Sequence, residues 1–112
     1  MARKPMPWFR VYVETMHDRK IRRLKPEHRW LWIVVLAMTR QSPVEGALMI
    51  SETEPAQAFD LADMAGLTER QTTAGLEHME QVGLIETDPD TGTWTVPAWN
   101  SRQFASDNRA GT

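Results

Sequence analysis

The sequence predicts a mainly helical α+β domain, and three observations support that prediction. Residues 26–41 and 68–82 combine helical apolar spacing with recognisable helix starts and stops. Two β-rich runs, 84–87 and 93–96, flank a turn rich in Asp, Pro and Gly, which is typical of a β-hairpin. The chain has 112 residues and is 41% hydrophobic, which suits one compact domain.

The N-terminal part begins with an alternating run. Phe9, Val11 and Val13 alternate with less apolar neighbours, and this period of two predicts a strand over residues 8–13. Residues 17–25 follow, where Ile21 and Leu24 stand three apart in a basic surrounding. That spacing indicates a short helix or a turn with one apolar edge.

The first long helix is expected over residues 26–41. Pro26 suits a first helical position, and Glu27 lies in the first turn, where the helix dipole favours a carboxylate. The stretch 30–38 is apolar around most of the helix circumference. We therefore expect this helix at the centre of the core, or shared with a partner.

A short strand at residues 47–50 and a second helix over 55–66 come next. Pro55 would open that helix and Gly66 would end it. Phe59, Leu61 and Ala62 are expected to face inward.

The third helix has the clearest start. Thr68 is a good N-cap with Leu67 before it, the helix extends to about Val82, and Gly83 supplies the left-handed residue after it. Its expected buried stripe is Leu76, Met79 and Val82.

The predicted order is helix, short strand, helix, turn, helix and hairpin. This is the order of a winged helix-turn-helix, a three-helix core with a C-terminal β-hairpin wing, here with an added N-terminal strand. We assign residues 1–104 to one such domain and 105–112 to a loose tail.

A local pattern agrees with that order. Leu67, Leu76, Met79-Glu80 and Gly83-Leu84-Ile85 resemble the end of the recognition helix and the first wing strand of many winged-helix proteins. Thr72 departs from the pattern, because this position is usually apolar. We expect looser packing of the helix there.

A narrower resemblance includes the flanking segments. Trp8 to Tyr12, Asp18 to Leu24 and Trp99 to Asp107 together resemble the N-terminal domain of phage replisome organisers and related DnaD-like replication initiators. The resemblance spans nearly the whole chain. It implies a domain that binds origin DNA or self-associates, with a helicase-loading protein as a further partner.

Charge is unevenly distributed along the chain. Residues 1–29 carry nine Lys or Arg against three carboxylates, a net charge of +6, whereas residues 30–112 carry four Arg against twelve carboxylates, a net charge of −8. A surface that faces phosphates is therefore expected from the N-terminal third. The five candidate phosphate contacts are Arg19, Lys20, Arg22, Arg23 and Lys25.

The start of the third helix offers a second set of candidate DNA contacts. Its polar side chains could bond phosphates or base edges. The acidic residues Glu69, Glu77 and Glu80 on the same helix oppose that role, and the alternative is a helix that packs the core and presents a solvated acidic face. The candidates are Thr68, Arg70, Gln71 and Thr73.

Aromatic residues suggest self-association. A small domain has little interior, and large aromatic side chains are costly to leave in water. Aromatic side chains usually pack in the core. For Trp99 and Phe104, which follow the hairpin in a polar segment, we expect docking on this domain or on a second copy. The candidates for oligomerisation are Trp8, Trp30, Trp99 and Phe104.

Signs of enzymatic chemistry are absent from the sequence. The chain has no cysteine, no glycine-rich phosphate loop and no serine nucleophile elbow. His17, His28 and His78 lack metal-ligand spacing, so surface or capping roles are expected, and Glu52 and Glu54 are expected in a solvated loop. We expect no catalysis, no cofactor and no bound metal.

The absence of cysteine and of an apolar leader favours the cytoplasm, and the nine-residue apolar run is too short to span a membrane. The leading hypothesis is a winged-helix domain of a phage-type replication initiator that binds double-stranded DNA and forms a homo-oligomer. The alternatives are a protein-assembly module of a replication complex and a transcriptional regulator.

Overall fold

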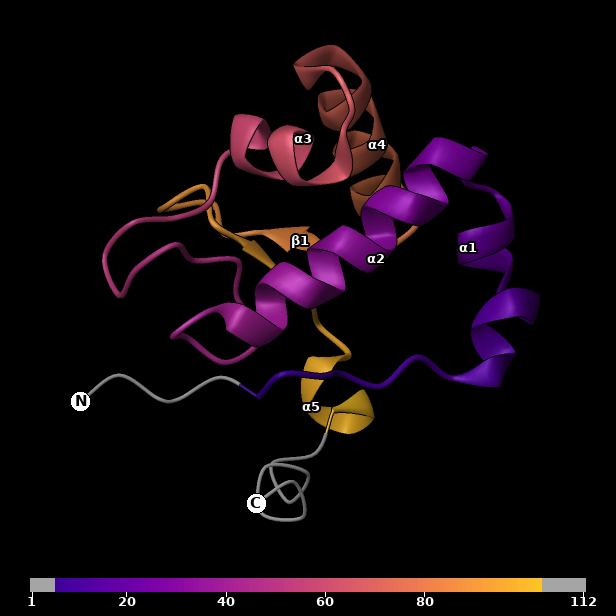
Figure 1. Cartoon of the computed structure of the whole chain (residues 1–112), viewed down its shortest axis with the longest axis horizontal. Helices are drawn as coiled ribbons and strands as arrows, with labels where there is room; N and C mark the ends of the chain where they lie inside the picture. The colour runs from indigo at the N-terminus through magenta and orange to yellow at the C-terminus, as the bar shows by residue number, and fades with distance from the viewer. Residues whose placement is uncertain (1–5, 104–112) are drawn as a thin grey trace.

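The computed structural model of the chain describes residues 6–103. Within that range the protein is α+β and mainly helical, with one two-stranded antiparallel sheet. Figure 1 shows α2 crossing the molecule, with α3 and α4 on one side of it and α1 beyond one end. The elements in chain order are η1 (Val13–His17), α1 (Arg19–Arg22), α2 (Pro26–Gln41), α3 (Ala58–Ala65), α4 (Glu69–Gln81), β1 (Glu86–Thr87), β2 (Trp94–Thr95) and α5 (Trp99–Arg102).

Helix α2 has the predicted boundaries and the predicted central place. Pro26 stands at its start, where a missing backbone N–H costs nothing, and Ser42 follows its last residue. Leu31 and Val35 are completely buried, and both α3 and α4 pack on this helix. The apolar run of the sequence therefore forms the middle of the core.

Helix α3 begins three residues later than predicted. Pro55 forms an isolated bridge with Met49 instead of opening the helix, and Gln57 becomes the N-cap in a capping box with Asp60. The predicted end is correct, because Gly66 has the left-handed φ of 71°.

The inward face of α3 differs from the prediction at one position. Leu61 and Ala62 are buried, as expected, but Phe59 is 55% exposed. Phe59 lies two residues before Leu61, which is about 200° around the helix and hence on the other side.

Helix α4 follows the sequence closely. The Thr68 hydroxyl accepts a hydrogen bond from the Gln71 backbone N–H, and the Gln71 side chain accepts one from the Thr68 backbone N–H. The expectation of loose packing at Thr72 is wrong. Thr72 is fully buried, and its hydroxyl donates to the Thr68 carbonyl at 2.9 Å, so the extra polar group is satisfied within the helix.

The hairpin is present and shorter than predicted. Glu86 pairs with Thr95 and Thr87 with Trp94 in an antiparallel register, and Gly92 takes a positive φ in the connecting turn. The strand expected at 47–50 is reduced to isolated bridges, one of which joins Ala47 to Thr95. This segment lines the edge of the hairpin without forming a ladder.

The strand predicted at residues 8–13 is absent. The segment is extended up to Tyr12 and then turns into η1 at Val13. The carboxamide of Gln103 takes the place of a neighbouring strand, since it accepts from the Arg10 backbone N–H and donates to the Arg10 carbonyl, each at 2.8 Å. The alternating pattern thus predicted extended backbone correctly and a sheet partner wrongly.

The helix or turn expected at 17–25 is a single turn of helix, α1. Asp18 caps it by accepting from the Lys20 backbone N–H at 2.8 Å, and Ile21 and Leu24 are buried against the core. His17 falls in η1, before this cap.

Trp99 at the start of α5 fixes the C-terminal part of the described chain. The ring is 2% exposed, its indole N–H donates to Glu45 Oε1 at 2.8 Å, and the Arg40 guanidinium lies 5.1 Å from the ring centroid. Arg40 also donates to Gln103 Oε1 at 3.2 Å. The end of α2, α5 and the N-terminal segment are therefore held together by one group of contacts.

The contact between α2 and α4 at Gly75 yields a stability prediction. A β-carbon at Gly75 would lie 2.8 Å from both His28 Cδ2 and Leu31 Cδ2. Gly75→Ala should lower the free energy of unfolding by about 1–3 kcal/mol, because the clash outweighs the gain of about 1 kcal/mol in helix propensity. Urea denaturation measures this, with exposed Thr73→Ala on the same helix as control. Equal or higher stability of Gly75→Ala would contradict the close packing.

Candidate nucleic-acid interface

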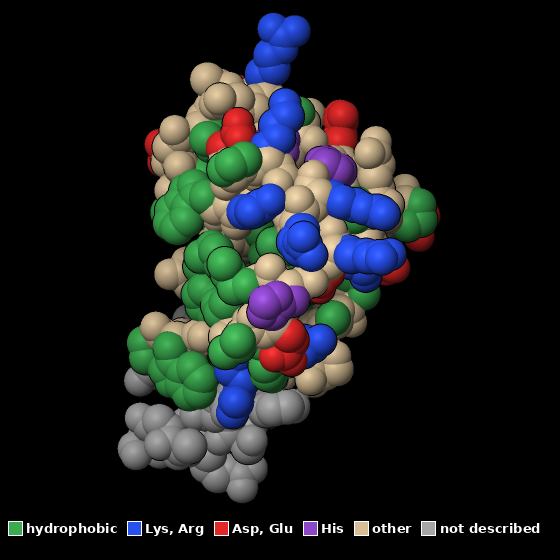
Figure 2. Space-filling model, turned by 90° about the vertical axis from the view of Figure 1, so that its right-hand side faces the viewer, with side chains coloured by type: hydrophobic (Ala, Val, Ile, Leu, Met, Phe, Trp, Pro, Cys, Tyr) green, Lys and Arg blue, Asp and Glu red, His purple; other side chains and the backbone are tan. Residues whose placement is uncertain are grey.

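The five predicted phosphate contacts lie on and just after α1. Arg19, Lys20, Arg22, Arg23 and Lys25 are all exposed. Buried Ile21 and Leu24 anchor the same stretch to the core, so the backbone that carries the cations is fixed. Figure 2 looks onto this side of the molecule and shows Lys and Arg side chains gathered there. We call these five residues the basic cluster.

Arg29, in the first turn of α2, supports the backbone that carries the basic cluster. Its Nε donates to the Leu24 carbonyl and its Nη2 to the Arg22 carbonyl, each at 3.0 Å. These bonds close the turn between α1 and α2 and add a sixth cation beside the five. The sequence carries one signal for this role, a cation placed five residues after Leu24, but that spacing alone does not identify the two carbonyls that accept its hydrogen bonds.

Carboxylates do not neutralise the basic cluster. Within residues 6–103 none of the five cations forms an ion pair. Arg102 shows the contrast, because it meets Glu14 at 3.3 Å and its guanidinium lies 5.0 Å from the Tyr12 ring centroid. Cations without acidic partners can neutralise phosphates, and the release of counterions condensed on the duplex then favours binding.

The candidate residues on α4 divide into two kinds. Thr68 and Gln71 hold each other in the capping box, so their bonding oxygens already have partners. Arg70 and Thr73 are exposed. The same helix also exposes its three glutamates, Glu69, Glu77 and Glu80, so the surface of α4 is predominantly acidic.

Lys20 and Arg70, one residue from each predicted contact group, lie near opposite ends of α4. Lys20 Nζ lies 3.7 Å from the position of a β-carbon on Gly83, so α1 adjoins the C-terminal end of α4. Arg70 is in the first turn of α4, about 20 Å away along the helix at 1.5 Å per residue. The separation applies to Lys20, because α2 packs on α4 at His28 and Gly75, three residues after Lys25 and five after Arg70.

The four aromatic candidates for oligomerisation also have different positions. Trp8 is 38% exposed and Trp30 is 50% exposed, with its indole N–H donating to the Ala65 carbonyl at 2.9 Å. Trp99 docks on its own chain and offers no exposed ring, so a role for it between copies is not supported by its burial. Phe104 and the tail 105–112 lie outside the described residues.

Histidines and carboxylates show no arrangement for metal binding. Among residues 6–103 no group of three or more His, Cys, Asp or Glu side chains is close enough to hold a metal ion. His28 corrects the expectation of surface or capping roles, since it is only 5% exposed and packs against Gly75. Glu52 and Glu54 are exposed in a loop, as expected.

A cavity of about 190 Å³ lies where the N-terminal segment, α1, α2 and α5 meet. Trp32, Leu36 and Trp99 are among its apolar lining residues, and Glu14 and Arg102 lie among the charged ones. No local pattern in the sequence indicates this cavity, because its walls come from segments up to 90 residues apart, such as Tyr12 and Arg102.

A membrane-spanning helix is absent from residues 6–103, since no helix in that range has the length and apolar character that a membrane crossing requires.

The role of Gln71 in the capping box can be tested by measuring the free energy of unfolding of Gln71 variants. Gln71→Ala should lower the free energy of unfolding by about 1 kcal/mol because it removes half of the capping box, whereas Gln71→Glu keeps the acceptor and should retain it. Arg70→Ala, at the neighbouring exposed position, should change stability by less than about 0.5 kcal/mol. If Gln71→Ala matched Arg70→Ala in urea denaturation, the side chain would be free to contact a ligand.

Comparison with known proteins adds no support to these assignments, which rest on the geometry of the chain. No protein-family model, curated protein or solved structure matches it. The resemblance to replication initiators accordingly stays a prediction from sequence.

Proposed function

We propose that this protein is a DNA-binding domain of the winged-helix type, and that it contacts the phosphates of double-stranded DNA through the basic cluster. One observation carries the proposal. Five exposed cations that form no ion pair with any residue of the range 6–103 are concentrated within seven residues, on a segment that two buried side chains anchor.

The electrostatics of the chain support phosphate contact at α1 in preference to α4. The basic cluster combines five positive charges, and each phosphate it neutralises releases condensed counterions from the duplex. Exposed Glu69, Glu77 and Glu80 on α4 repel phosphates. Arg70 and Thr73 are then the remaining candidates for contacts to base edges, and we assign them a smaller share of the binding.

The order of α2, α3, α4 and the hairpin is compatible with a small winged helix. This supports the proposed fold type, and the sequence resemblance supports a role in a phage-type replication initiator that acts in the cytoplasm. In that proposal the domain needs no cofactor and catalyses no reaction. A transcriptional regulator would use the same basic cluster, so comparison of origin-derived with unrelated duplexes is the experiment that separates the two roles.

A second candidate function is a protein-assembly module within a replication complex, with a helicase-loading protein as a possible partner. The acidic surface of α4 favours it, since Glu77 and Glu80 lie on a helix that DNA would otherwise approach. This module would engage a partner protein without touching DNA.

Charge removal in the basic cluster tests the leading proposal. Replacing Arg19, Lys20, Arg22 and Arg23 by Gln should weaken binding to every duplex by at least about tenfold at low salt. It should also flatten the plot of log affinity against log salt by about 0.9 per lost phosphate contact. Titration by fluorescence anisotropy over a range of salt concentrations measures both quantities.

The matched control keeps the charge at the same positions. Replacing Arg19, Arg22 and Arg23 by Lys should leave the salt dependence nearly unchanged, because a phosphate contact needs the charge more than the guanidinium shape. Equal binding by the Gln variant and the wild type, or absence of binding by the wild type at low salt, would refute the proposed phosphate contact.

A further inference from the structure

The outward side of α2 carries an uncharged apolar stripe. Trp30, Ile33 and Ala37 follow one another at spacings of three and four, which places them on one side of the helix. Trp30 is 50% exposed, and Ile33 and Ala37 are half-buried. Between Trp30 and Thr39 the helix has no charged residue, and Arg40, which lies on the same side three residues after Ala37, is buried against Trp99 and Gln103 of its own chain.

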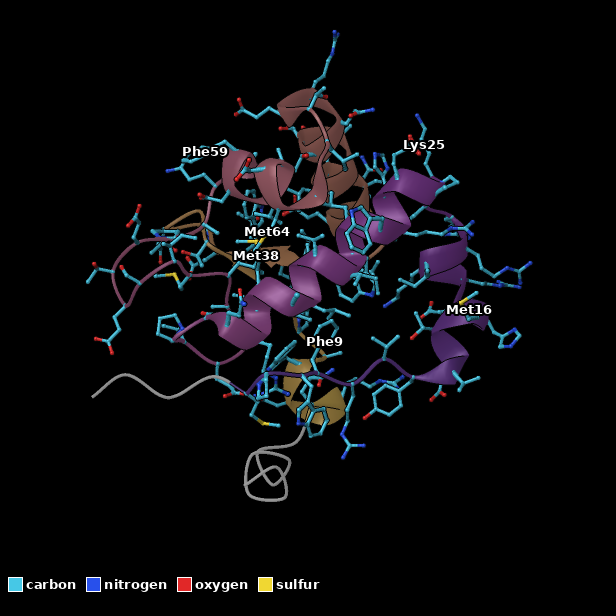
Figure 3. The ribbon with its side chains drawn as sticks, viewed as in Figure 1. Phe9, Met16, Lys25, Met38, Phe59 and Met64 are labelled. Atoms are coloured by element: carbon cyan, nitrogen blue, oxygen red, sulfur yellow. The ribbon has the colours of Figure 1, made fainter. Side chains whose placement is uncertain are left out.

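The neighbouring helix extends this stripe. Met64 of α3 is 57% exposed, and the Trp30 indole bonds to the adjacent residue, Ala65, so the two helices join at the surface. Figure 3 labels Met38 of α2 and Met64 together between the two helices. In Figure 2 hydrophobic side chains run along the edge that corresponds to the front of Figure 1, where α2 lies. We call Trp30, Ile33, Ala37, Met38 and Met64 the α2 face.

Charge at the two ends of α2 indicates what covers this face. Lys25 and Arg29 flank its N-terminal end, and Lys25 is labelled there in Figure 3. The loop after its C-terminal end exposes Glu52 and Glu54. A second α2 running in the opposite direction would bring the basic end of each copy toward the acidic end of the other, whereas a parallel one would set like charges together.

Side-chain size along the stripe favours the same direction. The spacing of Trp30, Ile33 and Ala37 matches the seam of two helices packed at a shallow angle. With Ile33 at the centre of an antiparallel pair, Trp30 lies three residues from the centre and Ala37 four, so the large Trp30 of each copy lies within about 1.5 Å, along the helix axis, of the small Ala37 of the other. A parallel pair would oppose two tryptophans at one end and two alanines at the other.

We propose that the α2 face is the interface of a two-fold symmetric dimer in which two α2 helices pack antiparallel across Ile33. The same patch serves both copies, as two-fold symmetry requires. The dimer uses a different side of the molecule from α1 and does not depend on DNA binding. For the assembly function, the α2 face is then the binding surface, and a second copy of this chain is the partner that binds it.

A matched pair of charge insertions tests the interface. Ala37→Glu places a carboxylate within the proposed contact, four residues from its centre at Ile33, and Ala74→Glu places the same group on the exposed surface of α4. In sedimentation equilibrium the wild type and Ala74→Glu should dimerise alike, and Ala37→Glu should raise the dimer dissociation constant by more than about tenfold. A wild type that is monomeric at all concentrations, or an Ala37→Glu variant that dimerises like it, would overturn the proposal.

Disulfide trapping tests the direction of packing without inserting a charge. The chain contains no cysteine, so a single introduced thiol reports on one position. Ile33→Cys should cross-link two copies, because residues at a two-fold axis face each other. Gln41→Cys should not, because eight residues place each thiol about 12 Å from the centre, and the two thiols about 24 Å apart.

Cross-linking of Gln41→Cys as readily as Ile33→Cys would show parallel packing and overturn the antiparallel arrangement. Duplex binding is measured separately on Ala37→Glu and on the Gln variant of the basic cluster. Loss of dimerisation in the first variant and loss of DNA affinity in the second are therefore distinguishable results.

Discussion

Burial of α2 is the interaction on which the rest of the structure depends. Leu31 and Val35 are completely buried within it, and the close approach of Gly75 to His28 and Leu31 brings α4 against the same helix. At the other end, Arg40 meets Trp99 and Gln103, and Gln103 holds the backbone of the N-terminal segment. A single strongly apolar helix thus positions both the helical core and the chain ends of the described region.

The parts of the fold that could be predicted are those encoded by neighbouring residues. The boundaries of α2 follow from Pro26 and Ser42-Pro43, the start of α4 from Thr68, and the ends of α3 and α4 from Gly66 and Gly83. Helix caps and left-handed glycines act within one turn of the chain, so the sequence displays them directly. The exposed basic cluster was predictable for a similar reason, because its five cations lie within seven residues of the chain.

The parts that could not be predicted depend on contacts between distant residues. An extended segment needs a partner to become a strand, and nothing near residues 8–13 shows that Gln103, 93 residues after Arg10, provides the bonds instead. The burial of His28 depends on a glycine of another helix. The distance between Lys20 and Arg70 likewise follows from the place of the Lys20 side chain beside Gly83, after the far end of α4, which no local pattern specifies.

Chemical-shift mapping by NMR tests the central claim, that the basic cluster is the surface that meets DNA. A short duplex is titrated into the labelled protein at low salt, and backbone amide shifts are followed along α1, α2 and α4. Our account predicts the largest changes at residues 19–25 and at Arg29, which closes the turn beneath them. Changes confined to residues 69–82 of α4, with none on α1, would contradict it.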